Sequence, residues 1–370
     1  MIYLDNAATT LIKPAEVGWA MQRAMRTMAS PGRGGHAPAM RAAEEVYACR
    51  EAAAELFGVE DPARVVFTCS ATHALNLAIH SLAGRGTRVL LSGFEHNAVT
   101  RPLHAARASL RIAGRRLFDP ASLLEEWEAA LPWAHLAVCT HVSNVFGYVL
   151  PIEELAALCR RRGVPLIVDA SQSAGVLPVD MRSLGAAFIA MPGHKALFGP
   201  QGTGLLLCGR DGEPLMQGGS GTESRLQQMP EALPERLEAG THNVCGIAGL
   251  RAGIDYVRRT GTDAILRHER KLLALMRREL ADSGLRLFTG PAERQCGVLS
   301  LLVPGLDSEE AAARLSERGV CVRAGLHCAP TAHESAGTLE SGTVRCSFSP
   351  FVTEEEVLSA CAALRELAAG

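Results

Sequence analysis

The stretch IEELAALCRRRGVPLIVDASQ, residues 152–172, contains a complete transition from a helix to a strand. Apolar residues recur at helical spacing over 152–162, and Gly163 follows directly, as a glycine that ends a crossover helix would. The apolar run over 166–170 predicts a buried strand, which places Asp169 near its carboxyl end. Together the two elements predict a βα unit of a parallel sheet.

The same alternation of apolar runs and helical patterns extends on both sides, from about residue 64 to residue 210. We therefore predict an α/β fold with a mainly parallel sheet, formed in a large domain of residues 15–242. Its further strands are expected at 64–68, 88–92, 136–141, 186–190 and 204–208.

After the Gly- and Pro-rich stretch 218–234 the pattern changes, which predicts a smaller α+β domain made of residues 1–14 and 243–370. Its elements follow from the same reading of periodicity. Helices are expected at 243–260, 262–283, 308–318 and from 353 onward, and strands at 285–289, 297–303, 320–323 and 343–348.

Composition excludes several classes of protein. Hydrophobic residues make up 48% of the 370 residues and charged residues 21%, which argues against disorder, and the net charge of −2 argues against a nucleic-acid partner. The sequence has no apolar run of about 18 residues and no signal-peptide pattern, so we expect a cytoplasmic protein without a membrane partner. Its 11 cysteines are scattered singly, unlike a disulfide framework or a zinc site.

Lysine is rare, since only Lys13, Lys195 and Lys271 stand among 37 basic residues. Arginine stays protonated and cannot form an imine, so any amine chemistry must use one of these three. A coding bias toward arginine is the alternative explanation.

A candidate phosphate site follows the strand at 64–68, where the chain enters a helix through small residues. The N–H groups of Ala71 and Thr72, together with the Thr72 hydroxyl, would converge on an anion at the positive end of that helix. A simple Ser or Thr helix cap is the alternative.

A carboxylate and a lysine follow neighbouring predicted strands, because 166–170 delivers Asp169 and 186–190 leads into Lys195. A buried ion pair would explain them equally well. A lysine for an imine, an acid for a ring nitrogen and donors for a phosphate are, however, the groups that pyridoxal 5'-phosphate (PLP) requires, and the Gly-rich turn 199–204 lies close by in sequence.

Taken together, these segments make the chain resemble fold-type I PLP enzymes of the class V aminotransferase family, most closely the branch of cysteine desulfurases and selenocysteine lyases. The resemblance covers nearly the whole length, and it rests on the joint order of motifs that are weak singly. The motifs are YLDNAATT (3–10), SAT (70–72), EHNA (95–98), SNVFG (143–147), DASQ (169–172), GHK (193–195), EAGT (238–241) and RAGLHCA (323–329).

The resemblance implies roles around PLP for matching residues. Lys195 would form the imine and take the proton from the substrate Cα, while Asp169 would keep the pyridine nitrogen protonated. Gln172 would bind the ring hydroxyl, and His96 would stack on the ring, where it could also relay a proton. The phosphate would be held by Ala71, Thr72 and His194, and by Thr241 of the partner subunit, which implies a homodimer.

For the substrate, the resemblance implies that Asn144, beside the cofactor, and Arg345 bind the α-carboxylate, for which the planar fork of arginine is suited. Arg33 and His36 resemble a loop near the substrate. Each assignment has a structural alternative: a helix-start histidine for His96, a turn former for Asn144, a surface partner of the last helix for Arg345, and a purely structural loop for 31–36.

Cys328 decides the reaction. It stands in a polar, Gly-bounded segment after Arg323 and His327, which favours a thiolate, whereas the other cysteines mostly fall on strands or helix faces. We therefore predict a cysteine desulfurase that converts L-cysteine to L-alanine and leaves the sulfur on Cys328 as a persulfide. A selenocysteine lyase, a class V aminotransferase and a PLP-binding regulatory protein without turnover are the alternatives.

The chain also departs from the family pattern. Leu326 stands where the best-known members with a short loop have the first of two histidines, which removes a group for proton transfer. Arg345 follows Cys328 after only 17 positions, which resembles the subgroup with a compact loop. A protein that accepts the sulfur would then have to approach the pocket.

Overall fold

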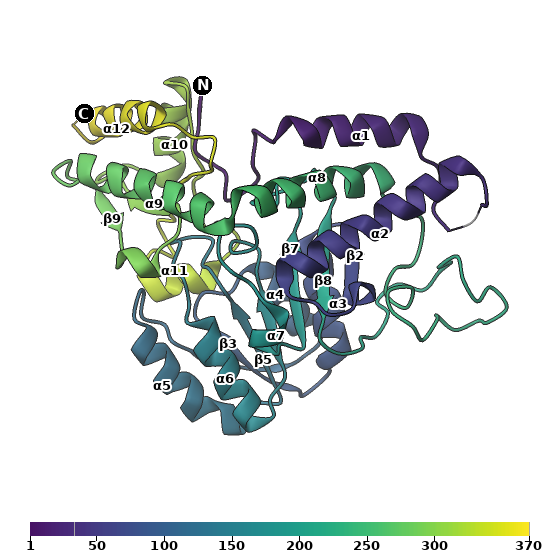
Figure 1. The fold of residues 1–370 in the computed structure, drawn as a ribbon. Helices are drawn as coiled ribbons and strands as arrows, with labels where there is room; N and C mark the ends of the chain where they lie inside the picture. Colours follow the sequence, from purple (N-terminus) through teal and green to yellow (C-terminus); the bar gives the residue numbers. More distant parts are fainter. Residues whose placement is uncertain (33, 370) are drawn as a thin grey trace.

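The computed structural model describes residues 1–32 and 34–369, built around a seven-stranded sheet in the order β2-β8-β7-β6-β5-β3-β4 (Figure 1). β8 runs antiparallel to β2 and β7 while the other pairs are parallel, so the predicted mainly parallel sheet is confirmed. The strands are β2 (Val65–Thr68), β3 (Arg88–Ser92), β4 (Ser109–Ala113), β5 (Leu136–Thr140), β6 (Leu166–Asp169), β7 (Phe188–Pro192) and β8 (Gly204–Cys208).

Both faces of the sheet are covered, which is why its inner strands are continuous apolar runs. In β6, for example, Leu166 and Val168 enter one core while Ile167 enters the core on the opposite face. The first core receives α2 (Ala37–Phe57), α5 (Pro120–Ala130), α6 (Ile152–Arg162) and α8 (Val244–Thr260), and the second receives α3 (Ala71–Leu82) and α4 (Asn97–Ala105).

Helix α6 and the strand after it match the prediction closely. Gly163 ends the helix in the left-handed region (φ +66°), and its N–H donates to the Arg160 carbonyl, which only a residue without a Cβ does at little cost. The sequence pattern misses β4, because this edge strand exposes Ser109 and Leu110 and therefore lacks an apolar run.

The remaining elements build a second core around a three-stranded antiparallel sheet in the order β12-β10-β9. The elements after residue 260 are α9 (Thr262–Glu279), β9 (Arg286–Phe288), β10 (Val298–Leu302), α10 (Ser308–Glu317), β11 (Val320–Cys321), α11 (Pro330–Ala336), β12 (Val344–Ser347) and α12 (Glu354–Ala369). All of them are predicted from the sequence except α11.

The start of the chain belongs to this second core. β1 (Ile2–Tyr3) pairs in parallel with β11, and Leu4 is fully buried among its side chains. α1 (Ala15–Thr27) then crosses to α8, whose Ile247 and Leu250 pack into the core of the large sheet. The predicted division at residue 243 stays a prediction, since α8 follows that position and packs with both parts.

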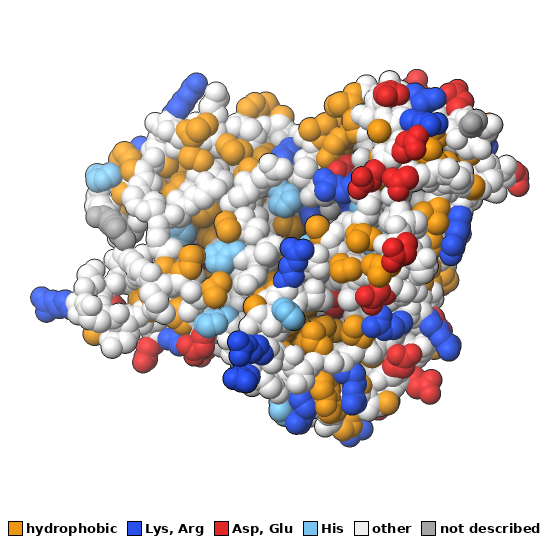
Figure 2. All heavy atoms as spheres, turned by 180° about the vertical axis from the view of Figure 1, so that it is seen from behind, with side chains coloured by type: hydrophobic (Ala, Val, Ile, Leu, Met, Phe, Trp, Pro, Cys, Tyr) orange, Lys and Arg blue, Asp and Glu red, His pale blue; other side chains and the backbone are white. Residues whose placement is uncertain are grey.

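The surface carries mixed charge. On the face shown in Figure 2, basic and acidic side chains are interspersed, as a net charge of −2 leads one to expect, and histidines gather in its middle part. Among the described residues no helix combines the length and the apolar character needed to cross a bilayer. The segment between β8 and α8 extends away from the sheet at the right of Figure 1.

Candidate active site

A cavity of about 340 Å³ lies where the parallel strands end. β6 ends at Asp169, and its parallel neighbour β7 leads into Lys195, so the predicted meeting of these two groups at one edge is confirmed. Thr241 and His36 do not line this cavity. The predicted site residues that do line it are Ala71, Thr72, His96, Asn144, Asp169, Gln172, His194, Lys195, Cys328 and Arg345.

The N-terminus of α3 borders the cavity. Ser70 Oγ accepts the His73 N–H (3.1 Å), so a serine cap is present, as the alternative reading expected. In the described chain, however, the N–H groups of Ala71 and Thr72 donate to no other residue, and both residues line the cavity. Cap and anion site therefore coexist, because the cap uses a different donor.

His194 borders the same cavity. Its Nδ1 is buried and meets no hydrogen-bonding partner within residues 1–32 and 34–369. Burial, assisted by the charges of Lys195 and Lys13, lowers the pKa of His194 to about 4. The ring is therefore neutral at physiological pH, and its buried nitrogen is free to bond an oxygen of a ligand.

Lys195 forms no ion pair in the described chain, so its amine is available for reaction. Within the described chain its Nζ makes no ion pair, so the ion-pair alternative for Asp169 is wrong. Burial lowers the pKa of Lys195 to about 8, although the Asp169 charge opposes that shift. Thr10 Oγ1 donates to the carbonyls of His194 (3.1 Å) and Lys195 (3.3 Å), which fixes the backbone of this turn.

Asp169 is 3% exposed, and its Oδ1 accepts the N–H of Ser171 (2.9 Å). This bond orients the carboxylate at the end of β6. Gln172 Nε2 donates to the Ala7 carbonyl (3.0 Å), so the N-terminal segment holds the amide that was predicted to meet the ring hydroxyl.

His96 caps a helix, as the structural alternative expects, and its place in the cavity wall leaves the predicted stacking on a cofactor ring as a prediction. It caps α4, since Nδ1 accepts the Ala98 N–H (3.0 Å), and it also lines the cavity. Because Nδ1 accepts, the proton of the neutral ring lies on Nε2. Burial lowers the pKa of His96 and the charge of Asp169 opposes that shift, so the ring is an uncharged donor at neutral pH.

The backbone around Cys328 is unusual. His327 (φ +48°) and Cys328 (φ +57°) are consecutive left-handed residues, although neither is glycine, so the turn carries strain that its surroundings must hold. Asn144 Nδ2 donates to the His327 carbonyl (2.8 Å), and Asn97 N donates to the Cys328 carbonyl (2.7 Å). Asn144 is thus not a mere turn former: it holds the cysteine turn from across the cavity.

The charge expected beside Cys328 is only partly present. Burial lowers the pKa of His327 to about 2, so its ring is neutral, and the expectation that it favours the thiolate by charge is wrong. Its Nε2 lies 3.1 Å from the Thr343 carbonyl. Cys328 is also not alone in being exposed, because Cys69 is exposed too, beside His73.

The turn that carries His96 is joined to the segment that follows Cys328. Thr331 Oγ1 donates to the Glu95 carbonyl (2.9 Å), and Ser335 Oγ donates to the Gly93 carbonyl (2.9 Å). These donors lie on α11, which sequence patterns missed because it is a short helix of mixed character. Cys328 is consequently fixed beside His96 by bonds on both sides.

Arg345 is buried at 2% exposure, so its alternative role as a surface partner is wrong. Arg345 NH2 bonds Asp5 Oδ1 (2.9 Å), and Arg323 Nε bonds Asp5 Oδ2 (3.0 Å). Arg345 Nε is buried without a partner in the described chain, which leaves a donor for an incoming carboxylate. Asp5 lies within the motif YLDNAATT, but the sequence alone assigns it no role because its partner is 340 positions away.

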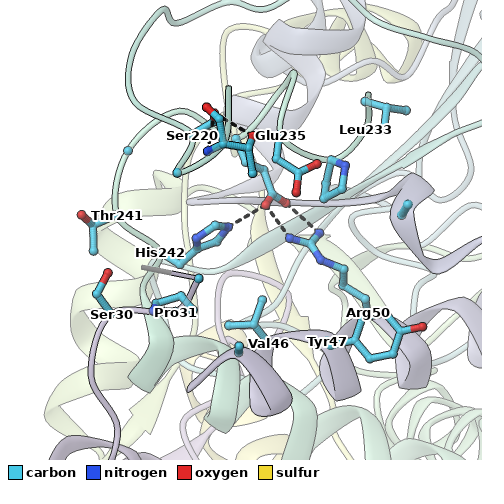
Figure 3. A pocket seen from close by; sticks show the side chains of 18 of the residues that line it. Ser30, Pro31, Val46, Tyr47, Arg50, Ser220, Leu233, Glu235, Thr241 and His242 are labelled. Atoms are coloured by element: carbon cyan, nitrogen blue, oxygen red, sulfur yellow. Dashed lines mark hydrogen bonds and ion pairs between the residues drawn. The ribbon is translucent and has the colours of Figure 1, made fainter. Parts of the chain in front are cut away.

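Thr241 lies on another cavity, of about 540 Å³, and is exposed (Figure 3). Glu238 and His242 hold its segment, since the Glu238 carboxylate bonds His242 Nε2 (2.6 Å) and the guanidinium of Arg50 (2.8 Å). Glu238 and Arg50 also bond the outer edge of β2, since Glu238 accepts the Phe67 N–H (2.5 Å) and Arg50 donates to the Val65 carbonyl. Thr241 therefore projects from an anchored segment.

His36 does not reach the cavity within this chain. Its Nδ1 accepts the Ala39 N–H (3.4 Å) at the start of α2, which matches the structural reading of that loop. Arg33 lies outside the described residues.

Comparison with known proteins agrees with this geometry. The family model "Aminotransferase class-V" matches residues 2–359. The chain is 33% identical to a probable cysteine desulfurase of Methanothermobacter thermautotrophicus, covering 99% of this chain and 94% of that one. It is similar to the apo structure of a cysteine desulfurase from Thermococcus onnurineus NA1 (32% identity, TM-score 0.91, 100% and 95% covered) and to cysteine desulfurase CsdA from Escherichia coli (25%, 0.84, 99% and 94%).

Substituting Asp5→Asn should leave the buried guanidinium of Arg345 without its carboxylate and lower the free energy of unfolding by about 3–5 kcal/mol. Urea denaturation followed by circular dichroism measures this loss. Glu310→Gln, which breaks the exposed pair with Arg314, is the control and should change stability by less than about 1 kcal/mol. Equal effects of the two substitutions would contradict the structural role of Asp5.

Proposed function

Since the chain belongs to the class V aminotransferase family, we propose that it is a PLP-dependent cysteine desulfurase that converts L-cysteine to L-alanine and leaves the sulfur on Cys328. The observation that carries this proposal is one cavity with an unpaired lysine amine at the end of β7 and an exposed, fixed cysteine thiol in its wall. The cysteine desulfurase names of the relatives reported above favour this reaction over aminotransfer or a role without turnover.

The residues present fit PLP. The N–H groups of Ala71 and Thr72 and the buried Nδ1 of His194 offer donors for a phosphate, and Asp169 offers a carboxylate for a protonated ring nitrogen. PLP bound through Lys195 would supply an electron sink for the bonds at the substrate Cα. His96 and Gln172 line the same cavity, where His96 would pack on the ring and Gln172 would bond its hydroxyl.

Lys195 would hold the α-proton of the substrate at Nζ. Its pKa of about 8 leaves a useful fraction of neutral amine near neutral pH, which is the form that accepts a proton. Arg345 would bind the α-carboxylate through its unpartnered Nε, while Asp5 keeps the guanidinium in place. The substrate would then be oriented with its sulfur toward Cys328.

Sulfur transfer would form one bond and break another. The Cys328 thiolate attacks the substrate sulfur, the new S–S bond forms, and the Cβ–S bond breaks with its electron pair left on the carbon side. A proton completes Cβ, and Lys195 returns a proton to Cα, which yields alanine and a Cys328 persulfide. His96, whose Nδ1 accepts the Ala98 N–H and whose Nε2 therefore carries the proton of the neutral ring, would supply the proton for Cβ.

The sulfur acceptor must come to Cys328. Asn144 and Asn97 hold the carbonyls on either side of the thiol, so the turn is not built to swing out of the cavity. An acceptor thiol, on a small molecule or on an extended protein segment, would have to enter from outside. Its identity and the cytoplasmic location stay predictions.

The active form would be a homodimer in which each subunit completes the phosphate site of the other. Thr241 supports this arrangement because it is exposed, held on an anchored segment, and absent from the lining of the cavity in its own chain. The partner's Thr241 would then add a hydroxyl donor to the phosphate.

Cys328→Ala should abolish persulfide formation and alanine release from L-cysteine while PLP binding is kept, because the lysine and phosphate groups remain. Alanine assay and mass spectrometry of the Cys328 peptide measure this. Cys69→Ala, which removes the other exposed cysteine, is the matched control and should stay active. Persulfide and alanine production by the Cys328 variant would overturn the assignment; turnover of L-selenocysteine alone, by both proteins, would indicate a selenocysteine lyase.

Subunit mixing tests the homodimer. Thr241→Val should weaken PLP binding about 10–100-fold, the loss of one hydrogen bond to a charged group, and Lys195→Ala should be inactive. When the two variants exchange subunits at limiting PLP, heterodimers hold one complete site, and about a quarter of the wild-type activity should return. Titration of PLP by fluorescence gives the affinity independently. No gain on mixing would show that Thr241 serves its own chain or neither.

A further inference from the structure

Lys13 is a half-buried cation that has no carboxylate beside it. It lies just before α1, and within residues 1–32 and 34–369 no acidic side chain forms an ion pair with it. Burial lowers the pKa of Lys13 to about 8, so the ammonium form still prevails at neutral pH. A cation removed from water is costly without a counter-charge, so a nearby anion would stabilise this side chain.

The ammonium of Lys13 bonds the turn that leads into Lys195. Its Nζ donates to Thr10 Oγ1 (2.8 Å) and to the His194 carbonyl (3.4 Å). That carbonyl also accepts the Thr10 N–H (3.2 Å) and the hydroxyls of Thr9 (3.2 Å) and Thr10 (3.1 Å). A carbonyl oxygen has two lone pairs, so more donors approach it than it can bond fully. The result is a concentration of positive charge around one backbone oxygen.

The start of α1 holds Lys13 against this turn. Pro14 directly follows the lysine, is buried, and accepts the Val17 N–H at its carbonyl (3.0 Å). Proline restricts the residue before it to extended conformations, so the backbone of Lys13 has little freedom. Lys271 differs in this respect, because it pairs with Glu354 on the exposed surface. The contact between Lys13 and the turn is therefore built into the fold.

The peptide that carries this carbonyl also carries the N–H of Lys195. In the described chain that N–H donates to no other residue. Positive charge at a carbonyl oxygen draws electrons toward the oxygen, which makes the N–H of the same amide a stronger donor. His194 Nδ1, in the same turn, is buried without a partner in the described chain, and the residue lines the active-site cavity. The turn thus offers two unused polar groups, and Lys13 strengthens one of them.

The donors that this chain offers to a phosphate are uncharged. They are the N–H groups of Ala71 and Thr72 and the neutral ring of His194. Both arginines that line the same cavity are bonded to Asp5 instead. A phosphate group carries about two negative charges near neutral pH, which neutral donors leave uncompensated. Lys13 is a cation at this turn whose charge no carboxylate in the described chain compensates.

We propose that Lys13 supplies the counter-charge for the PLP phosphate, acting through the peptide between His194 and Lys195. The inference rests on the proposed function, which places the phosphate at this turn. Lys13 does not line the cavity, so it is a positioning residue that attracts the anion from behind the turn and strengthens the N–H on the opposite side of the peptide. The interaction is electrostatic, and no covalent bond forms or breaks.

The test uses the full-length apoprotein and two ligands: PLP, and pyridoxal, which has the same ring and aldehyde but no phosphate. Lys13→Met keeps nearly the length of the side chain and removes its charge. It should weaken the binding of PLP about 10-fold, as expected for one charge that acts over a short distance inside a protein, and it should leave the binding of pyridoxal unchanged. Fluorescence titration measures both dissociation constants.

Two further variants separate charge from structure. Lys271→Met removes the same charge from an exposed ion pair and is the matched control, so it should leave both affinities unchanged. Lys13→Arg keeps a cation and a donor, and it should restore most of the preference for PLP. A purely structural role of Lys13 would weaken both ligands alike, because the displaced turn carries Lys195. Equal losses for PLP and pyridoxal in Lys13→Met, or no loss for either, overturn the proposal.

Inorganic phosphate gives a readout that needs no bond to Lys195. It should raise the melting temperature of the wild-type apoprotein, since a ligand of the folded state stabilises it, and the rise should be smaller in Lys13→Met but kept in Lys271→Met. An equal rise in Lys13→Met, or none in the wild type, would also overturn the proposal. These measurements need no turnover. A wild type that binds PLP through Lys13 but yields no alanine from L-cysteine would contradict the proposed function alone.

Discussion

The reactivity of the cavity depends on a buried lysine amine that forms no ion pair with a carboxylate in the described chain. Lys195 lies near enough to Asp169 to feel its charge, yet in the described chain the two make no ion pair, so burial lowers the lysine pKa to about 8. Direct contact with Asp169 would favour the ammonium and remove the amine. The register of β6 and β7, together with the bonds from Thr10 to the lysine turn, therefore determines the reactivity of the site.

The two ends of the chain complete this cavity. Asp5 meets Arg345 across 340 positions of sequence, and Asn144 holds the turn of Cys328 across 183 positions. Closing such long loops costs entropy that many contacts must repay together. The parallel sheet supplies the lysine and its surroundings, but the thiol and the guanidinium reach their places only when the second core has docked.

The sequence predicts the parts of this structure that local patterns determine. Helical periodicity and a terminal glycine predict α6 and β6 almost to the residue. Because β6 and β7 are predicted as neighbouring strands, Asp169 and Lys195 are expected at one edge of the sheet, as found. The partner of Asp5, the neutral state of His327 and the surroundings of Lys13 depend on burial and distant contacts, which no local pattern encodes. The edge strand β4 and the short helix α11 lack a strong period, and so they were missed.

The pair formed by Arg50 and Glu238 also bears on association between copies. β2 is an edge strand, and an unpaired edge offers N–H and C=O groups to any strand that comes near. Here the Glu238 carboxylate accepts the Phe67 N–H and the Arg50 guanidinium donates to the Val65 carbonyl, so two side chains make the hydrogen bonds that a neighbouring strand would make. The segment that carries Thr241 thereby helps to prevent another strand from pairing with the edge of β2.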